Sequence, residues 1–207
     1  MGRKLVIKVS ILILFLLVSF GVAAAAAAAA DLGTAVNFSM FTSIGALSNV
    51  NSSLITGDVG TNSGANSGFG LPTVLNGTLH NPGATTALVA IDLLAAYNEL
   101  MTVPVTDATH AAAFGSGETV GPGVYTIGSA ATLAGNLTLD AGGDASAIFI
   151  FRINGAYSTS ANSEMILANG ALADNVYWVA EGAISLATGT VVKGTLLAHA
   201  GAVSAAA

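Results

Sequence analysis

The side chains that usually carry out catalysis are few in this chain. It contains no cysteine, and its three histidines, His80, His110 and His199, lack the short spacings of a metal site. It also lacks the Gly-x-Ser-x-Gly motif of a hydrolase nucleophile. After residue 30 the only basic side chains are Arg152 and Lys193, too few for the clustered acids and bases of a lyase groove. We therefore expect no enzyme, with no catalytic residues, no metal ligands and no cofactor.

One acidic pair needs separate mention. Asp140 and Asp144 flank Gly142-Gly143, a pattern that either a calcium loop or a capped turn would produce. The sequence favours the turn, in which an acceptor side chain caps the corner.

Hydroxyl groups, by contrast, recur in a fixed context. The phrase Gly-Ala-apolar-Ser occurs at Gly45-Ala46-Leu47-Ser48, Gly155-Ala156-Tyr157-Ser158, Gly182-Ala183-Ile184-Ser185 and Gly201-Ala202-Val203-Ser204. A strand-and-corner phrase repeated among small residues is typical of a β-solenoid, which presents flat faces and no deep pocket.

Side chains alternate along a strand, so the serine of each phrase and later polar residues are predicted to share one outward face. The candidate surface residues are Ser48, Asn51, Ser53, Ser158, Ser160, Ser163, Ser185, Thr188, Thr190 and Ser204. Two alternatives stay open. Serine and asparagine commonly bond at chain corners, so each candidate could be an ordinary corner residue. A register shift of one residue would also turn the whole set to the opposite side of the sheet.

The remaining elements must carry that face. Short strands separated by Gly, Asn and Ser are expected over most of the chain, and residues 148–151 lack alternation, which predicts a strand covered on both sides. One long helix is predicted at about 84–101, ended by Pro104. Its predicted packing stripe consists of Ala87, Ala90, Ile91, Leu94, Tyr97 and Met101.

Residues 1–30 are typical of a secretory signal peptide, with Arg3, Lys4 and Lys8 before a short apolar core and an alanine-rich cleavage region. A retained membrane anchor is the alternative, disfavoured because the apolar run is short. Residues 31–207 then carry two cations against eleven carboxylates, a net charge of −9, which argues against nucleic acid as a partner. We expect one secreted domain over 31–207, with no membrane partner after cleavage.

Several ordered motifs resemble a known family. They include Gly121-Pro122-Gly123-Val124-Tyr125, Ala147-Ile148-Phe149-Ile150-Phe151, Asn175-Val176-Tyr177-Trp178-Val179 and Gly194-Thr195-Leu196-Leu197-Ala198. With them the chain resembles, from about Leu32 onward, the ice-binding-like (adhesive) domain family of secreted microbial antifreeze proteins. The resemblance implies a mainly β, discontinuous right-handed β-helix of triangular cross-section, with one long helix along a side and one flat ice-binding face.

One departure concerns the end of the chain. The family usually continues past the last Gly-Ala-Val-Ser with a further rung, whereas this chain reads Ala205-Ala206-Ala207 there. If a rung is missing, the last strand should expose an unpaired edge.

The function that follows is binding to an ice crystal surface, which would inhibit ice growth and recrystallisation. This needs no proton transfer, only a rigid array of weak polar groups and methyls. The protein is expected to act as an extracellular monomer. The alternative is an extracellular adhesive or structural module that uses the same face on a carbohydrate or a protein.

Overall fold

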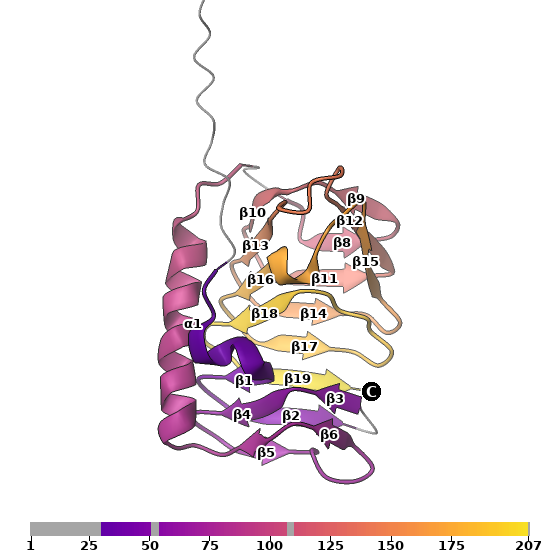
Figure 1. The fold of residues 1–207 in the computed structure, drawn as a ribbon. Helices are drawn as coiled ribbons and strands as arrows, with labels where there is room; N and C mark the ends of the chain where they lie inside the picture. The colour runs from indigo at the N-terminus through magenta and orange to yellow at the C-terminus, as the bar shows by residue number, and fades with distance from the viewer. Residues whose placement is uncertain (1–29, 51–53, 107–109, 207) are drawn as a thin grey trace, which may run out of the picture.

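Parallel strands stack around a central core in this computed structural model, which describes residues 30–50, 54–106 and 110–206 (Figure 1). The chain turns through three faces in a fixed order, and one such turn, or rung, contributes β8, β9 and β10 before β11 begins the next. The rung of β17 and β18 has only an isolated bridge, at Val191, on the third face. All strand pairs are parallel. The predicted mainly β solenoid is confirmed.

One face is a continuous sheet of seven strands, which we call the seven-stranded face. In spatial order its strands are β5 (Asn66–Ser67), β2 (Leu47–Val50), β19 (Val203–Ala206), β17 (Ile184–Leu186), β14 (Tyr157–Thr159), β11 (Ala131–Ala134) and β8 (Ala113–Gly115).

The other two faces are each divided into two sheets. The helix-side face contains β10 (Gly123–Ile127), β13 (Phe149–Ile153), β16 (Val176–Ala180) and β18 (Thr195–Ala198), and then β1 (Phe38–Thr42), β4 (Asp58–Thr61) and β7 (Leu79–His80). The third face contains β15 (Glu164–Ala168), β12 (Asn136–Asp140) and β9 (Glu118–Val120), and then β3 (Leu54–Thr56) and β6 (Val74–Asn76). Of two short 3-10 helices, η1 (Gly33–Asn37) precedes β1 and η2 (Ala173–Asn175) lies between β15 and β16.

The order of strands is not the order of the sequence. Strands β1 to β7 form one end of the stack, α1 (Ala84–Thr102) runs along the side, and the chain then winds back from the far end (Figure 1). The last strand, β19, pairs with β17 on one edge and with β2 on the other. The expectation of an unpaired edge at the last strand is therefore wrong, because N-terminal strands cover it.

Large side chains fill the interior between the three faces. Phe151 and Trp178 are fully buried and stack with ring centroids 4.1 Å apart, and Tyr157 continues the stack at 5.0 Å from Trp178. Burial of such rings supplies much of the free energy that holds a domain without disulfides together.

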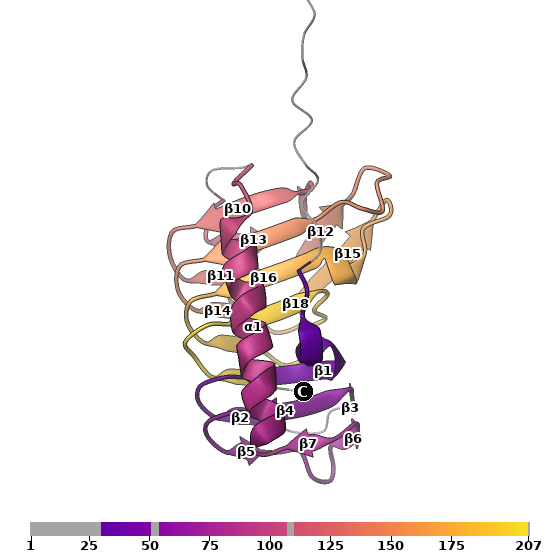
Figure 2. The same ribbon diagram turned by 60° about the vertical axis from the view of Figure 1, so that its left-hand side comes forward.

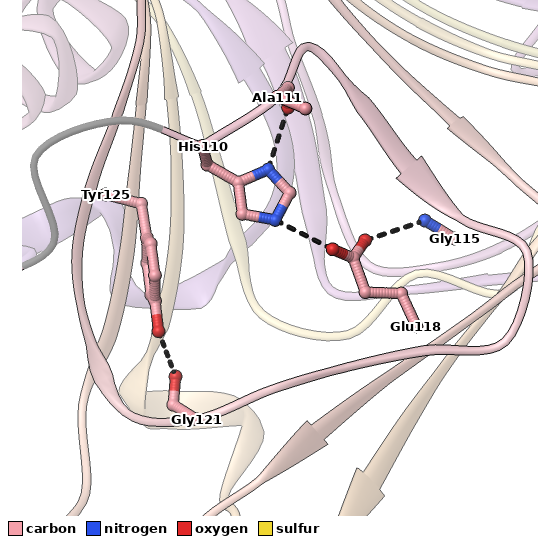
Figure 3. Close-up of polar contacts among 6 residues, drawn as sticks. All are labelled: His110, Ala111, Gly115, Glu118, Gly121 and Tyr125. Carbon is pink, nitrogen blue, oxygen red and sulfur yellow. Dashed lines mark hydrogen bonds and ion pairs between the residues drawn. The ribbon is translucent and has the colours of Figure 1, made fainter.

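His110 and Glu118 bond to each other at the end of the stack formed by β8, β9 and β10 (Figure 3). The His110 ring stacks on Phe114 at 4.1 Å, and its Nε2 lies 3.0 Å from Oε1 of Glu118. The other oxygen of Glu118 accepts a hydrogen bond from the Gly115 amide. The His110 ring therefore covers Phe114, an aromatic ring of the core.

Helix α1 crosses the strands of the helix-side face (Figure 2). Strands β13 and β16 are buried along their whole length, because the solenoid core covers one side and helix α1 contributes to a second apolar cluster on the other. This confirms the strand predicted to be covered on both sides. The buried Arg152 of β13 donates from Nε to the Leu100 carbonyl oxygen at 3.0 Å, which satisfies a carbonyl at the end of the helix.

The helix packs with a different side from the predicted one. Its buried residues are Thr86, Val89, Ala96 and Leu100. Ile91 and Leu94, placed in the predicted stripe, are 63% and 50% exposed. Apolar residues occur almost all around this helix, so their periodicity did not identify the buried side. By its length and apolar composition α1 could also span a membrane, but in this structure it lies along the solenoid.

Tyr97 links the helix to the solenoid. Its hydroxyl donates to the carboxylate of Glu181, and its ring stacks on His199 at 4.2 Å. Glu181 Oε2 also lies 2.9 Å from Nδ1 of His199. Burial and the neighbouring carboxylate raise the pKa of Tyr97 to about 12, while bonds from Tyr97 and His199 lower the pKa of Glu181.

The buried side of the helix can be tested with two truncations to alanine. Leu100→Ala should lower the free energy of unfolding by about 2 to 5 kcal/mol, because it opens a cavity in a packed seam. Ile91→Ala should change it by less than about 1 kcal/mol, because Ile91 faces solvent. Denaturant titration monitored by circular dichroism measures both, and an equal loss in the two variants would contradict the observed packing.

Candidate functional site

Small polar side chains form a straight row on the outside of the seven-stranded face. The strand register places one residue of each strand in line with the next. We call this the hydroxyl row: Ser67, Ser48, Ser204, Ser185, Ser158, Thr132 and Ala113. Six of the seven carry a hydroxyl group.

A second row, which we call the alanine row, lies two residues before each member of the hydroxyl row, just before each strand begins. It consists of Ala65, Ala46, Ala202, Ala183, Ala156, Ala130 and Ala111, all exposed. The residues between the two rows point inward, and Leu47, Tyr157 and Ile184 among them are fully buried. No long side chain rises from either row, so the surface is flat.

The spacing of the two rows follows from the backbone. Adjacent strands lie about 4.8 Å apart and alternate residues about 6.6 Å apart along a strand, so hydroxyls and methyls form a regular net. Neighbouring hydroxyls contact each other directly, with Thr132 Oγ1 and Ser158 Oγ 3.0 Å apart and Ser204 Oγ 3.3 Å from Ser185 Oγ. These contacts restrict the rotation of groups that would otherwise turn freely.

Four of the ten residues predicted from the sequence lie on this surface. Ser48, Ser158, Ser185 and Ser204 are members of the hydroxyl row. Ser160 is exposed two residues after Ser158, just past the end of β14. Asn51 and Ser53 lie outside the described residues.

Three predicted residues lie at the corner beyond the face. Ser163 was predicted to point outward, which is wrong: it is fully buried, with Oγ 3.1 Å from the Leu133 carbonyl oxygen. Thr190 is also a corner residue, with Oγ1 2.7 Å from the Ala187 carbonyl oxygen. Thr188 is exposed but lies in the same turn, after β17 has ended. Alternation was extended past strands of only three residues, and it stops where the strand stops.

Sequence reasoning missed Thr132, Ser67 and most of the alanine row. A weaker signal for the first two was present, because Ala130-Ala131-Thr132 and Gly64-Ala65-Asn66-Ser67 are imperfect copies of the repeated phrase. In the first copy serine replaces the glycine before it and threonine replaces serine, and in the second asparagine replaces the apolar residue.

Groups that titrate are absent from the outer side of this face. The seven strands contain no Asp, Glu, Lys, Arg or His, and Tyr157, whose pKa burial raises, points into the core. Each histidine lies elsewhere beside a single carboxylate, as His80 does with Asp58 at 3.0 Å. No group of three or more possible metal ligands occurs within the described residues.

Asp140 and Asp144 accept hydrogen bonds within their own turns, from Gly142 and Ser146, and these bonds lower the pKa of both carboxyls.

Two cavities are lined by residues that belong to neither row. One, of about 650 Å³, lies between β18 and β1, and the other, of about 530 Å³, lies beside α1. Apolar side chains such as Phe41, Leu93 and Leu196 contribute to their walls.

Fold and face together define a β-solenoid with one flat, uncharged, regularly patterned side. A family model described as "Ice-binding-like" matches residues 41–207. The chain belongs to this family.

Relatives in bacteria and fungi agree with that assignment. An ice-binding protein from Nostoc sp. (strain HG1) is 36% identical over 168 residues, which are 81% of this chain and 61% of the relative. Ice-binding protein K1-A from Typhula ishikariensis is 32% identical, over 81% of this chain and 76% of that protein. The chain thus spans less than two thirds of the length of the Nostoc relative.

Solved structures of the family have the same fold. An ice-binding protein from an Antarctic Flavobacteriaceae bacterium matches with a TM-score of 0.76 and 40% identity, covering 86% of this chain and 46% of that one. An ice-binding protein from the ascomycete Antarctomyces psychrotrophicus matches with a TM-score of 0.76 and 31% identity, covering 86% and 95%.

The distinction between corner and surface hydroxyls can be tested with two serines only three residues apart. Ser163→Ala should destabilise the protein by about 1 to 2 kcal/mol, because it removes a buried hydroxyl that bonds corner carbonyls. Ser160→Ala should change stability by less than about 0.5 kcal/mol, since that side chain is exposed. Thermal and denaturant unfolding measure both, and a larger loss for Ser160→Ala would contradict the assignment.

Proposed function

We propose that this protein binds ice through the seven-stranded face and thereby inhibits ice growth and recrystallisation. The observation that carries the proposal is the register of the hydroxyl row beside the alanine row on one flat sheet. Family membership and relatives named as ice-binding proteins support it.

The chemistry of the face suits a crystal of water. Hydroxyls held at a fixed repeat can bond to a layer of waters in lattice-like positions, while methyls between them leave room for water without binding it strongly. A charged side chain would hold its own hydration shell, which competes with the lattice. Pinned molecules then force the ice front to curve between them, and curvature lowers the local freezing point.

An adhesive module that binds a carbohydrate or protein remains the second candidate from the sequence, but the face favours ice. Recognition of another macromolecule usually relies on aromatic and Arg anchors set in pockets. No aromatic or charged side chain belongs to the hydroxyl row or the alanine row.

The setting proposed for this activity is extracellular. Residues 1–30 have the pattern of a secretory leader, and the domain proposed over 31–207 would act after its removal. Rigid adsorption requires no cofactor and no catalysis, so we propose a non-enzymatic protein that acts as a monomer, without a nucleic-acid or membrane partner.

The face can be tested by placing a bulky ring at its centre. Ser185→Tyr should abolish most thermal hysteresis and recrystallisation inhibition, because the ring holds the ice lattice away from both rows. Thr188→Tyr, in the nearby corner turn, is the matched control and should keep most of the activity. Both variants should unfold within about 0.5 kcal/mol of the parent, as is usual for surface substitutions.

Each outcome is informative. Equal activity in the two variants would reject this face. A parent protein that leaves ice crystals as round discs at high concentration would reject ice binding and favour the adhesive module.

Ice binding should also be insensitive to pH while the protein is folded. No side chain of the hydroxyl row or the alanine row titrates, so recrystallisation inhibition should be constant from about pH 5 to about pH 9. The pKa of Glu181 is lower in the folded protein than its ordinary value of 4.5. The ionised carboxylate therefore stabilises the fold at pH values above 4.5, and this stabilisation is lost as the pH falls through the folded-state pKa. Below about pH 5, activity and thermal stability should therefore decline together. If activity changed with pH near neutrality while circular dichroism stayed the same, the assignment of an uncharged face would be wrong.

A further inference from the structure

The stack contains one junction where the N-terminal strands meet the C-terminal strands, which we call the seam. It lies between the rung that ends in β19 and the rung that begins with β1. On the helix-side face β18 and β1 belong to separate sheets, and the third face is also divided. Among the described strands only those of the seven-stranded face pair across the seam, through β19 and β2.

A cavity of about 650 Å³ opens at the seam, and its walls include Met40 of β1, Leu196 of β18 and Val203 of β19. Buried residues on the two sides of the seam, such as Leu47 and Val203, still belong to one apolar core.

The corner beside the alanine row is wider at the seam than at other rungs. A β-carbon added to Gly201, Gly155 or Gly64 would approach the backbone of the neighbouring rung to 2.4, 2.7 or 2.3 Å. At the seam glycine, Gly45, the nearest atom would be 3.6 Å away, on Ala202.

The backbone hydrogen bond at this corner is poorer than its counterparts. Elsewhere an inward residue donates its amide to the alanine-row carbonyl of the next rung, from Leu47 to Ala65 at 3.0 Å and from Ile184 to Ala202 at 3.0 Å. Val203 pairs with Leu47 in the β19–β2 ladder, but its amide makes no bond of that length and alignment to the Ala46 carbonyl oxygen.

A side chain also crosses the corner. Thr42, the last residue of β1, is buried, and its Oγ1 lies 3.0 Å from the carbonyl oxygen of Gly201 in the rung across the seam. The same hydroxyl lies 2.8 Å from the Ile44 carbonyl oxygen. The corner carbonyl of Gly201 directly precedes Ala202 of the alanine row, and Ser204 of the hydroxyl row follows two residues later.

Thr61 makes the same kind of bond one rung away. Its Oγ1 lies 2.8 Å from the Gly45 carbonyl oxygen, and Thr61 is also buried. At that corner, however, the Gly45 amide also donates to the Ser63 carbonyl oxygen at 2.8 Å. Thr61 supplements a well-formed backbone bond, whereas Thr42 stands at the corner where the backbone bond is poorer.

We propose that Thr42 is a positioning residue for the ice-binding surface, holding β19 in line with β2 so that the two rows continue across the seam. This inference rests on the proposed function of the face. Without the Thr42 hydroxyl, residues 202–206 would be held at the seam by the β19–β2 ladder alone, and small displacements there would divide one net of seven rungs into nets of five and two.

The test compares three substitutions in the full chain. Thr42→Val keeps the shape and removes the hydroxyl, Thr42→Ser keeps the hydroxyl, and Thr61→Val is the matched control at the neighbouring corner. Amide hydrogen exchange of the free protein, followed by mass spectrometry over residues 202–206 and 46–50, reports on the seam without ice. Loss of one hydrogen bond corresponds to roughly a 3- to 10-fold change in an opening equilibrium.

We expect Thr42→Val to speed exchange in residues 202–206 by that factor, with Thr42→Ser close to the parent and Thr61→Val unchanged in this segment. Ice recrystallisation inhibition should fall several-fold in Thr42→Val and recover in Thr42→Ser, at temperatures where circular dichroism shows all variants folded. Unchanged exchange in Thr42→Val, or an equal rise in Thr61→Val, would overturn the role of Thr42 at the seam.

The two hypotheses fail in different ways. Faster exchange with full ice activity in Thr42→Val would overturn the positioning role while leaving ice binding intact. If the parent itself does not affect ice, the function proposal fails, and the positioning role in ice binding falls with it, whatever exchange shows. If Thr42→Val does not fold, the exchange and activity of Thr42→Ser and of Thr42→Ala decide the matter, and parent-like behaviour of Thr42→Ala would overturn the proposal.

Discussion

The parallel backbone ladder between rungs is the constraint on which this structure depends. Each rung must repeat the path of its neighbour at about 4.8 Å, so corners must be tight and residues at equivalent positions must be of similar size. Corner glycines meet this demand directly: an added β-carbon at Gly201 or Gly155 would collide with the backbone of the next rung. Once the ladder is in register, any residue type that recurs in the repeat becomes a straight row on the surface. The proposed ice-binding net is in this sense a consequence of how the chain stacks.

Without disulfides, the ladder relies on what covers its open sides. The helix and Arg152 cover one face, and His110 with Phe114 closes one end of the core. At the seam the cover comes from the chain itself, because β2 pairs with β19 although about 150 residues separate them in sequence. The N-terminal strands therefore complete a surface that the C-terminal strands begin. Folding must bring these ends together before the face reaches its full width, and contacts this distant in sequence form slowly.

The sequence predicted features that depend on local repetition, and it failed where distant contacts decide. The phrase around Ser48, Ser158, Ser185 and Ser204 was sufficient to place four residues in one row, because register and alternation are properties of the repeat itself. Ser163 and Thr190 were misplaced because strand ends are set by the corner bonds they make, which the local pattern does not reveal. The seam could not be predicted, because no local sequence pattern indicates that β19 pairs with β2.

The helix shows the same limit from the other direction. Val89 and Leu100 face the sheet while Ile91 and Leu94 face solvent, yet all four are strongly apolar. Burial of any of these side chains would release comparable hydrophobic free energy, so the choice between faces rests on specific anchors. Arg152 donates to the last turn of α1, and Tyr97 donates to Glu181, and together these bonds fix the rotation of the helix about its axis.

The distribution of charge separates the working surface from the scaffold. Arg152, Glu181, His199 and Glu118 make specific bonds that hold the helix or close an end, and none of them lies on the seven-stranded face. A protein usually relies on surface charge to stay soluble, and a flat uncharged sheet of this width would normally invite association. In the hydroxyl row and the alanine row the exposed groups are hydroxyls and single methyls, which offer little apolar area to a protein partner, although Val50 of β2 is also exposed. The same composition that limits protein contacts leaves the face free for an ordered layer of water.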